Sequence, residues 1–394
     1  MRILWASNAP HVPTGYGQQT ALMLPRLRDA GHDVAVAANF GVSGAVMEWE
    51  GFTIFPTGKT SFSADVIPAH ALAWFKDEPG WCICLYDAWT MKNPAFNDIN
   101  TAVWCPVDHH PVPPLVKQHF TDHGSLPIAM SQWGQRELER AGLNPMYAPH
   151  GIDTNLMHPI PKAEARERLG LDPDRFIVGM VANNHGRTPS RKAFPEHFLA
   201  FSILAQEHPD AMLYCHAQTE GDDAINLEVL ATANGIKPDQ LLFTDQYRLR
   251  SGQVPAKMMA HLYSAFDVLL FCSMGEGFGI PAIEAQACGT PVIVSDFSAQ
   301  PELVAPGAGF KVAGQPWWDD LQKAYFHLPN IEDMVNALGV AYANRAALDD
   351  LRPQIREHAL QWDADTVFQT HWQPILAELE GRLPSMEPIK AQAL

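Results

Sequence analysis

The chain has 394 residues, and its 27 lysines and arginines against 44 aspartates and glutamates give a formal net charge of −17. Such an acidic balance argues against nucleic acid and anionic membranes as electrostatic partners. The length exceeds what one ordinary hydrophobic core supports, so we expect two domains. An apolar content of 47% with 18% charged residues is typical of a well-packed soluble protein.

The six cysteines are scattered along the chain, and we expect them to be buried free thiols in a reducing cytoplasm. Cys82 and Cys84 are spaced as same-face neighbours on a strand and not as a redox or zinc pair. No apolar run approaches the ~20 residues that span a bilayer, and the N-terminus has no hydrophobic signal core. The sequence therefore predicts a cytoplasmic protein without a transmembrane segment.

The first forty residues predict a strand–helix–strand unit and hence a parallel sheet. Residues 2–7 form an apolar strand, a loop rich in proline and glycine follows, and a helix is expected from about Gln18 to Ala30. Pro25 should kink this helix or shift its start. Further strands are expected at 33–39, 81–86, 102–107 and 127–131, with an amphipathic helix after the last.

A second alternation of strands and helices begins after a stretch rich in proline and charge at 150–175, which we expect to be a linker. Strands are expected at 176–183, 211–217, 241–246, 267–272 and 290–296, and helices at 194–207, about 222–234, and 256–266. The remainder should be mostly helical. This pattern predicts two doubly wound α/β domains, at 1–160, completed by a helix at about 363–383, and at 170–360.

The segment "SMGEGFGIPAIEAQACGTPVIVSD" (273–296) predicts a phosphate-binding loop that opens a short helix. Pro281 is favoured in the first helical turn, and Gly289 fits a C-terminal stop. Gly275, Gly277 and Gly279 lie on the loop before the helix, where backbone N–H groups and the helix dipole attract an anion. A dinucleotide fingerprint fits less well, because its glycine spacing differs and it stands near the start of a domain.

Two carboxylates in the same segment need a different partner, because a carboxylate repels phosphate. Glu276 stands in the loop and Glu284 on the helix. A nucleotide sugar supplies hydroxyls for both, with its diphosphate between them. The alternative for each glutamate alone is a solvated side chain or a helix-dipole contact, which stabilises a helix by ~0.3–1 kcal/mol.

Residues 275–296 resemble the Glu-x7-Glu motif of the retaining GT-B glycosyltransferases in glycosyltransferase family 4, the glycosyl transferases group 1. Other segments match in the family's order, so the resemblance covers nearly the whole chain. It implies a GT-B fold, in which two Rossmann-like domains face each other across a cleft. It also implies that Glu276 contacts the donor sugar and Glu284 the ribose. Backbone groups for sugar and phosphate would come from Gly277, Phe278 and Gly279.

The segment "VANNHGRTPSRKAF" (181–194) places three cations within six residues of a strand-to-helix loop. In an acidic protein, such a cluster favours an anion as its partner, although a solvated basic loop is the alternative. The family places an arginine and a lysine on the donor pyrophosphate here. Lys192 matches the lysine, and the arginine is Arg187 or Arg191.

Two segments of the first domain resemble parts of the family's active site. "PTGYGQQT" (13–20) is similar to its N-terminal glycine-rich loop, which implicates Gly15 and Gly17, although an ordinary turn fits the spacing equally well. "WCPVDHHPVPPLVKQHFTDH" (104–123) occupies the place of a loop whose histidine faces the reacting sugar, which implicates Asp108 or His109. Asp87 is a weaker candidate for the acceptor side.

The segment 104–123 is also rich in residue types that bind metal ions. His119 and His123 have the spacing of ligands on a helix, and Cys105 and His110 lie nearby. We do not expect a metal there, because the prolines make most of the segment a loop and the family needs no metal ion.

The implied activity is a metal-independent transfer of a sugar from a nucleotide-diphosphate sugar to an acceptor hydroxyl, with retention of configuration and without a cofactor. The acceptor is a glycan, a small molecule, a lipid or a protein. Three alternatives stay open: another GT-B enzyme of nucleotide sugars, such as an epimerase or phosphorylase, a nicotinamide-dependent oxidoreductase, and a non-catalytic sugar-binding module.

Overall fold

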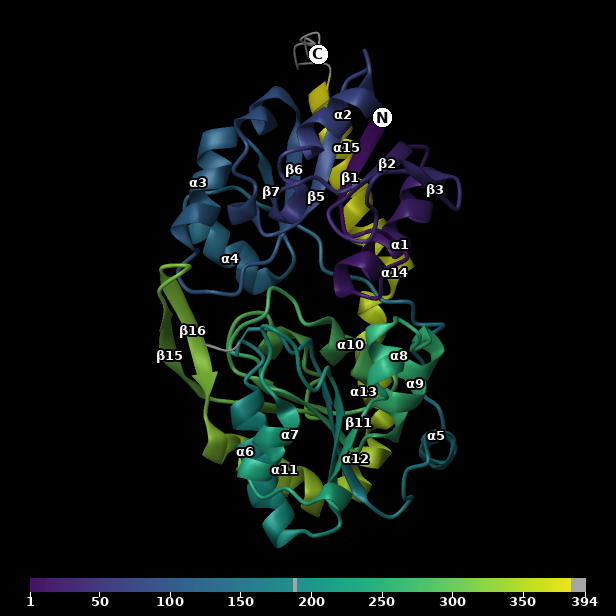
Figure 1. The fold of residues 1–394 in the computed structure, drawn as a ribbon, viewed down its shortest axis with the longest axis vertical. Helices are drawn as coiled ribbons and strands as arrows, with labels where there is room; N and C mark the ends of the chain where they lie inside the picture. Colours follow the sequence, from purple (N-terminus) through teal and green to yellow (C-terminus); the bar gives the residue numbers. More distant parts are fainter. Residues whose placement is uncertain (187–189, 384–394) are drawn as a thin grey trace. The chain divides into compact units, whose positions relative to one another are not determined.

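The computed structural model describes residues 1–186 and 190–383, and its chain divides into two compact units (Figure 1). The first unit comprises Met1–Gly151, Asp319–Ala324 and the described residues from Ala364 onward. The second comprises Ile152–Trp318 and Tyr325–Asp363. The expected linker at 150–175 thus falls almost wholly within the second unit, where it includes a helix.

The first unit is built on an eight-stranded sheet in the order β3-β4-β2-β1-β5-β6-β7-β8. All neighbouring strands pair in parallel except β3 with β4, which are antiparallel. The short pair β3 and β4 was not predicted, because its residues are only partly buried and their apolar pattern is weak. The strands are β1 (Arg2–Ser7), β2 (Asp33–Ala38), β3 (Met47–Trp49), β4 (Phe52–Phe55), β5 (Gly80–Leu85), β6 (Thr101–Cys105), β7 (Leu126–Ala129) and β8 (Met146–Tyr147).

Helices of the first unit cover this sheet: α1 (Gly15–Asp29), α2 (Ile67–Phe75), α3 (Pro114–His123), α4 (Gln132–Arg140), α14 (Ala364–Val367) and α15 (Gln373–Arg382). Helix α1 begins three residues before the expected start, because the Thr14 hydroxyl accepts the Gly17 N–H at 3.0 Å and caps it. The helix continues through Pro25. Short helical turns lie at Ser61–Ser63, Ala88–Thr90, Pro94–Asp98 and Phe368–Trp372.

The C-terminal segment is bound to the first unit by buried tryptophans. Trp372 is fully buried, with its ring centroid 5.7 Å from that of Trp5 and 4.9 Å from that of Trp104. Trp81 donates its indole N–H to the Leu379 carbonyl over 2.9 Å. These contacts join the last helices to strands β1, β5 and β6.

The second unit contains a parallel six-stranded sheet in the order β11-β10-β9-β12-β13-β14. Its strands are β9 (Phe176–Val181), β10 (Ala211–His216), β11 (Leu241–Phe243), β12 (Val268–Phe271), β13 (Val292–Ser295) and β14 (Phe310–Val312). A separate two-stranded sheet joins β15 (Gly314–Asp319) to β16 (Ala324–Pro329). The expectation of a mostly helical chain after 296 was therefore wrong for 310–329, where three strands lie, two of which carry adjacent aromatic pairs.

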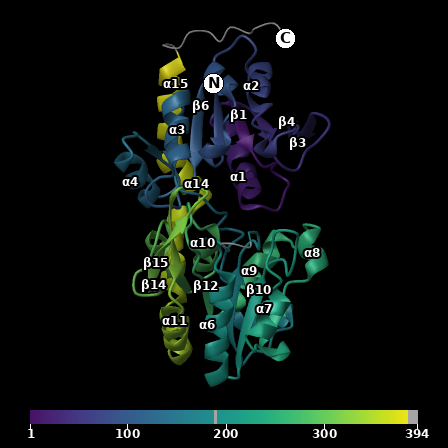
Figure 2. The same cartoon turned by 60° about the vertical axis from the view of Figure 1, so that its left-hand side comes forward.

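The helices of the second unit are α5 (Lys162–Leu169), α6 (Phe194–Glu207), α7 (Leu227–Ala233), α8 (Gln246–Arg250), α9 (Ala256–Ala265), α10 (Ile280–Ala287), α11 (Ile331–Ala343), α12 (Arg345–Asp350) and α13 (Arg352–Ala359). Short turns of 3-10 helix lie at Pro238–Gln240, Gln300–Leu303 and Leu360–Trp362. Helices α6 and α11 lie side by side (Figure 2), and their buried residues Phe198 and Leu338 join the core of the sheet. Helix α7 begins later than expected, because Asn226 caps it.

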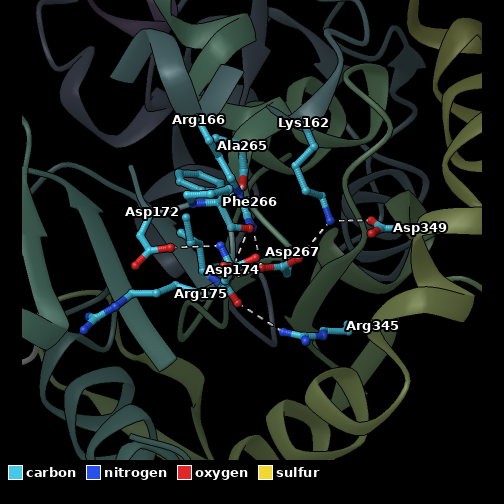
Figure 3. Close-up of polar contacts among 12 residues, drawn as sticks. Lys162, Arg166, Asp172, Asp174, Arg175, Ala265, Phe266, Asp267, Arg345 and Asp349 are labelled. Atoms are coloured by element: carbon cyan, nitrogen blue, oxygen red, sulfur yellow. Dashed lines mark hydrogen bonds and ion pairs between the residues drawn. The ribbon is translucent and has the colours of Figure 1, made fainter. Parts of the chain in front are cut away.

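A buried ion pair holds α5 against the amino ends of β9 and β12 (Figure 3). Arg166 donates to Asp267 Oδ2 over 2.7 Å and to the Ala265 carbonyl over 3.0 Å. Asp267 also accepts the Ile177 N–H at 2.6 Å and the Lys162 ammonium at 2.8 Å. Because Asp267 directly precedes β12, this network lies at the amino ends of the strands. The loops of the candidate functional site follow the opposite, carboxyl ends.

Two further expectations concern the whole chain. All six cysteines are buried and free, as the sequence predicted. Among the helices of residues 1–186 and 190–383, none is long and apolar enough to cross a membrane.

Candidate functional site

The candidate site of the second unit lies where two loops leave neighbouring parallel strands. Strands β9 and β12 pair in parallel, so their carboxyl ends lie on the same side of the sheet, where the strands end. The loop after β9 carries Arg191 and Lys192, and the loop after β12 carries Glu276. Ligands of open α/β sheets bind outside the carboxyl ends of the strands. The topology therefore favours a binding site at the carboxyl ends of β9 and β12.

Glu276 lies between the two predicted cations. Its side chain is 9% exposed, and its Oε1 accepts a hydrogen bond from the Lys192 ammonium. Arg191 Nη1 lies 3.2 Å from Glu276 Oε2 and donates to the Gly275 carbonyl over 2.6 Å. The structure thus brings Glu276 to two cations that precede it by 84 and 85 positions in the sequence.

The charges of this cluster keep Glu276 ionised. Burial alone would raise the pKa of its carboxyl, but the charges of Lys192 and Arg191 and the hydrogen bond from Lys192 lower the pKa below its ordinary value. The backbone of Glu276 is held as well, since its N–H donates to Ser298 Oγ over 2.9 Å. Ser298 has a φ of 56°, which is uncommon for a residue with a Cβ, and it was not predicted as part of the site.

Helix α10 begins directly after this loop and has an open N-terminus. Gly279 is its N-cap, no side chain caps the helix, and Pro281 stands in the first turn as predicted. Gly279 has a φ of 123°, and a Cβ there would lie 3.0 Å from Leu303 and 3.2 Å from Phe271. Glycine is therefore required at this position. The Phe278 side chain is buried, which leaves its backbone as the part of it that a ligand would meet.

Glu284, the second glutamate of the motif, is buried on α10 and is paired with a tyrosine that the sequence did not single out. The Tyr263 hydroxyl donates to Glu284 Oε2 over 2.8 Å. Burial raises the pKa of the Glu284 carboxyl to about 7, against the lowering effect of that hydrogen bond. One oxygen is thus committed to Tyr263, so a ligand hydroxyl would be met by Oε1.

The remaining predicted donor residues divide between described and undescribed parts. Gly15 and Gly17 lie in the first turn of α1, and the Gly17 N–H is already bound by Thr14. A Cβ on Gly17 would lie 2.3 Å from the Val12 carbonyl oxygen, so packing requires a glycine here whether or not it also contacts a donor. Arg187 lies outside the described residues, and its role stays a prediction.

In the first unit, His109 lies between two carboxylates. Its Nδ1 is 2.7 Å from Asp108 Oδ1, and its Nε2 is 3.2 Å from Asp319 Oδ2. Burial lowers the pKa of His109, but the hydrogen bonds and charges of the two aspartates outweigh it and raise the pKa. The sequence joined Asp108 to His109 but missed Asp319, which lies 210 positions away on an unpredicted hairpin.

The histidines considered as metal ligands have other neighbours. His119 Nδ1 lies 3.2 Å from the Met91 carbonyl, and His123 Nδ1 lies 2.7 Å from Asn97 Oδ1. Burial, and next the charge of His123, lowers the pKa of His119 to about 4. Within the described ranges, no group of three His, Cys, Asp or Glu side chains is arranged to hold a metal ion.

The solved structures that this chain resembles define its fold. Sucrose-phosphate synthase from Thermosynechococcus elongatus superposes with a TM-score of 0.73 at 18% identity, covering 97% of this chain and all of that one (100%). HepE from Anabaena, solved in complex with UDP-glucose, gives a TM-score of 0.69 at 17% identity over 96% of this chain and 100% of the other. The chain has the GT-B fold of glycosyltransferases.

Sequence comparison finds similarity to named glycosyltransferases over part of the chain. Residues 161–328 match the model of the family "Glycosyl transferases group 1". D-inositol 3-phosphate glycosyltransferase from Segniliparus rotundus is 33% identical over 157 residues, which are 40% of this chain and 33% of that protein. The enzyme of that name from Rhodococcus erythropolis is 28% identical over 263 residues, 62% of this chain and 52% of the other. These matches span a third to a half of the relatives' length, and the chain resembles the group 1 glycosyl transferases over residues 161–328.

Proposed function

We propose that the protein is a hexosyltransferase that moves a sugar from a nucleotide-sugar donor to an acceptor hydroxyl with retention of configuration. The observation that carries the proposal is the cluster of Arg191, Lys192 and Glu276 beside the open N-terminus of α10. It combines positive charge for a diphosphate with a carboxylate for sugar hydroxyls. The relatives named as glycosyltransferases and the neighbour solved with UDP-glucose support the same activity.

The electrostatics of the cluster suit a leaving diphosphate. In the structure, Glu276 accepts hydrogen bonds from both cations. A bound diphosphate would draw Arg191 and Lys192 towards its own oxygens and free the carboxylate for hydroxyls of the donor sugar. Cations and a helix N-terminus that already lie at the leaving group stabilise the charge that develops there. We propose that this makes a divalent metal ion unnecessary.

We propose that the nucleobase binds in a hollow at the carboxyl ends of the same sheet. The hollow has a volume of about 510 Å³ and lies after β10, which is the neighbour of β9. Its lining residues are Thr219, Glu220, Gln246, Tyr247, Arg250 and Ser251. Tyr247 is 73% exposed, so its ring offers an apolar face for stacking beside polar groups for base edges. Glu284 on α10 would then accept a hydrogen bond from the ribose.

Retention is proposed to proceed without a covalent intermediate. The bond from the anomeric carbon to the diphosphate oxygen breaks, and the acceptor oxygen forms the new bond on the same face of the sugar. The departing phosphate takes the proton of the acceptor hydroxyl. Asp108 and His109 are the proposed residues of the first unit that face the sugar, and Gly15 and Gly17 are proposed to contact the donor.

A thermal-shift screen with UDP-, GDP-, ADP- and TDP-sugars tests the proposal. One of the four should raise the midpoint of unfolding, because a ligand at 100 times its dissociation constant adds ~2.7 kcal/mol to the free energy of unfolding. The donor that binds is then incubated with candidate acceptors, and the anomeric proton is followed by NMR. A product with the anomeric configuration of the donor is expected. An inverted product would contradict retention, and stabilisation by none of the four would contradict the proposed donor class.

A further inference from the structure

His197 joins the two loops that carry the candidate donor site. It lies in the first half of α6 and is 1% exposed. Its Nδ1 is 2.6 Å from the carbonyl oxygen of Ala193, the residue after Lys192. Its Nε2 is 2.9 Å from the backbone nitrogen of Cys272, the residue after β12 and at the start of the loop to Glu276. One buried ring thus spans both loops.

The two contacts fix the state of the imidazole. A carbonyl oxygen only accepts hydrogen bonds, so Nδ1 carries the proton, and a backbone N–H only donates, so Nε2 is unprotonated. Burial lowers the pKa of His197 to about 4, which keeps the ring neutral at physiological pH. A doubly protonated ring or the Nε2–H tautomer would face the Cys272 N–H with a second donor, so only the Nδ1–H tautomer satisfies both loops.

The backbone beside Lys192 needs such support. Ala193 has φ 48° and ψ 39°, a left-handed conformation that is uncommon for a residue with a Cβ. Its carbonyl accepts from His197 Nδ1 and also from the His197 backbone N–H at 3.0 Å. Its own N–H donates to the Ser190 carbonyl over 2.7 Å. The turn that directs Lys192 towards Glu276 is therefore held by two hydrogen bonds from His197 to the Ala193 carbonyl.

A second connection between the two loops lies nearby. Met274 donates its backbone N–H to the Arg191 carbonyl over 2.8 Å, and the buried Met274 side chain packs with Ala193 and Phe326. This connection would remain if the histidine were replaced, so the loss of the ring should loosen the loops without separating them.

We propose that His197 is a positioning residue for the donor diphosphate, and that it sets the distance between the Arg191–Lys192 loop and the Glu276 loop through its Nδ1–H tautomer. The inference rests on the proposed function and adds to it a residue that touches no substrate. Its effect should concern the diphosphate, because the loops it joins carry the cations and the helix N-terminus, whereas the hollow proposed for the base lies after β10.

The test compares His197→Phe, His197→Gln and the control Phe198→Leu, a neighbour buried in the core of the same unit. Calorimetry measures the binding of whichever of UDP, GDP, ADP or TDP binds the wild type, and of the nucleoside with the same base. His197→Phe should lower diphosphate affinity and turnover roughly tenfold and leave nucleoside affinity unchanged, since it leaves the buried Cys272 N–H unpaired.

The second variant and the control separate positioning from simple loss of stability. His197→Gln can offer its amide oxygen to the Cys272 N–H, so it should recover part of the diphosphate affinity. Phe198→Leu should lower the midpoint of unfolding but keep the wild-type ratio of diphosphate to nucleoside affinity. An equal loss in Phe198→Leu, or an unchanged ratio in His197→Phe, would overturn the inference.

Nitrogen NMR of the wild type gives a readout that does not depend on activity. His197 should show a protonated Nδ1 and no titration above about pH 5, in line with its lowered pKa. A protonated Nε2 would contradict the assigned tautomer. A wild type that binds none of the four diphosphates would contradict the proposed function instead, which keeps the two failures distinct.

Discussion

The hydroxyl of Tyr263 donates to Glu284 Oε2 over 2.8 Å, and both side chains are buried. The tyrosine stabilises the charged form of a carboxyl whose pKa burial raises to about 7. Replacing it by phenylalanine should raise that pKa further, by roughly one unit for the loss of one hydrogen bond to a charged group. Donor affinity in Tyr263→Phe should then fall near pH 7 and recover near about pH 9.

Calorimetric titration of the donor at several pH values checks this prediction. The wild type should show the same rise in affinity with pH, at lower pH than the variant. A rise in affinity at the same pH in both proteins would contradict the role of Tyr263.

Glu284→Gln should change the pH dependence of the free energy of unfolding and, separately, lower the affinity for the donor. Burial raises the pKa of the Glu284 carboxyl from 4.5 to about 7, so the folded protein holds a proton that the unfolded chain releases in this range. The free energy of unfolding therefore falls as the pH rises from 4.5 to about 7. The glutamine variant lacks this titration, so its stability relative to the wild type should increase by about 2 kcal/mol between pH 5 and pH 8.

Urea unfolding at the two pH values measures this difference. Donor affinity of Glu284→Gln should fall by roughly 1–3 kcal/mol at pH 8, if the carboxylate accepts a charge-assisted hydrogen bond from ribose. An unchanged affinity would show that Glu284 is a core residue alone.

Lys192→Ala should reduce turnover and the affinity for nucleoside diphosphates more than the affinity for nucleosides, because its proposed partner is the leaving diphosphate. Lys257→Ala, which removes an exposed lysine from α9, is the matched control for net charge. Steady-state kinetics and calorimetry measure the two effects. Equal losses for nucleoside and diphosphate would contradict the assignment.

Arg166→Met should destabilise the second unit without changing the preference for diphosphate over nucleoside. Arg166 and Asp267 are 3% and 6% exposed, and removing one partner leaves a buried charge, at a cost of about 3–5 kcal/mol. Lys162 also contacts Asp267, so the loss should lie at the lower end of that range. Urea unfolding checks this, and a loss below about 1 kcal/mol would show that Lys162 suffices.

Asp319→Asn should lower the pKa of His109, since the Asp319 carboxylate is one of the two that raise it. NMR titration of the imidazole nitrogens measures the change. Asp108→Asn should act in the same direction, because Asp108 lies at 2.7 Å from Nδ1. An unchanged pKa in Asp319→Asn would mean that the contact with Nε2 does not persist in solution.

Local signals explain what the sequence predicted well. Strand β1 and helix α6 have the expected bounds, because each combines an apolar pattern with clear flanking residues. Helix α10 lies within one residue of the prediction, since Pro281 and Gly289 mark its ends. Glu276 and the cations at 191 and 192 come together because they follow parallel strands whose carboxyl ends are aligned.

Contacts between distant segments explain what the sequence could not show. Asp319 reaches His109 from a hairpin whose strands carry half-exposed aromatic residues. Tyr263 and His197 look like ordinary apolar-face residues of their helices, and only the fold brings them to Glu284 and Cys272. The early start of α1 depends on one side-chain cap, Thr14, which the glycines around it obscured.

We propose that the cations and the α10 N-terminus of the second unit bind the diphosphate of a nucleotide sugar. The most direct measurement is calorimetric titration of the wild type and Lys192→Ala with UDP, GDP, ADP and TDP in EDTA, beside the matching nucleosides. We predict that at least one diphosphate binds the wild type more tightly than its nucleoside, and that Lys192→Ala removes most of that difference. Equal affinity of diphosphate and nucleoside for the wild type, or diphosphate binding that requires a divalent ion, would contradict the account.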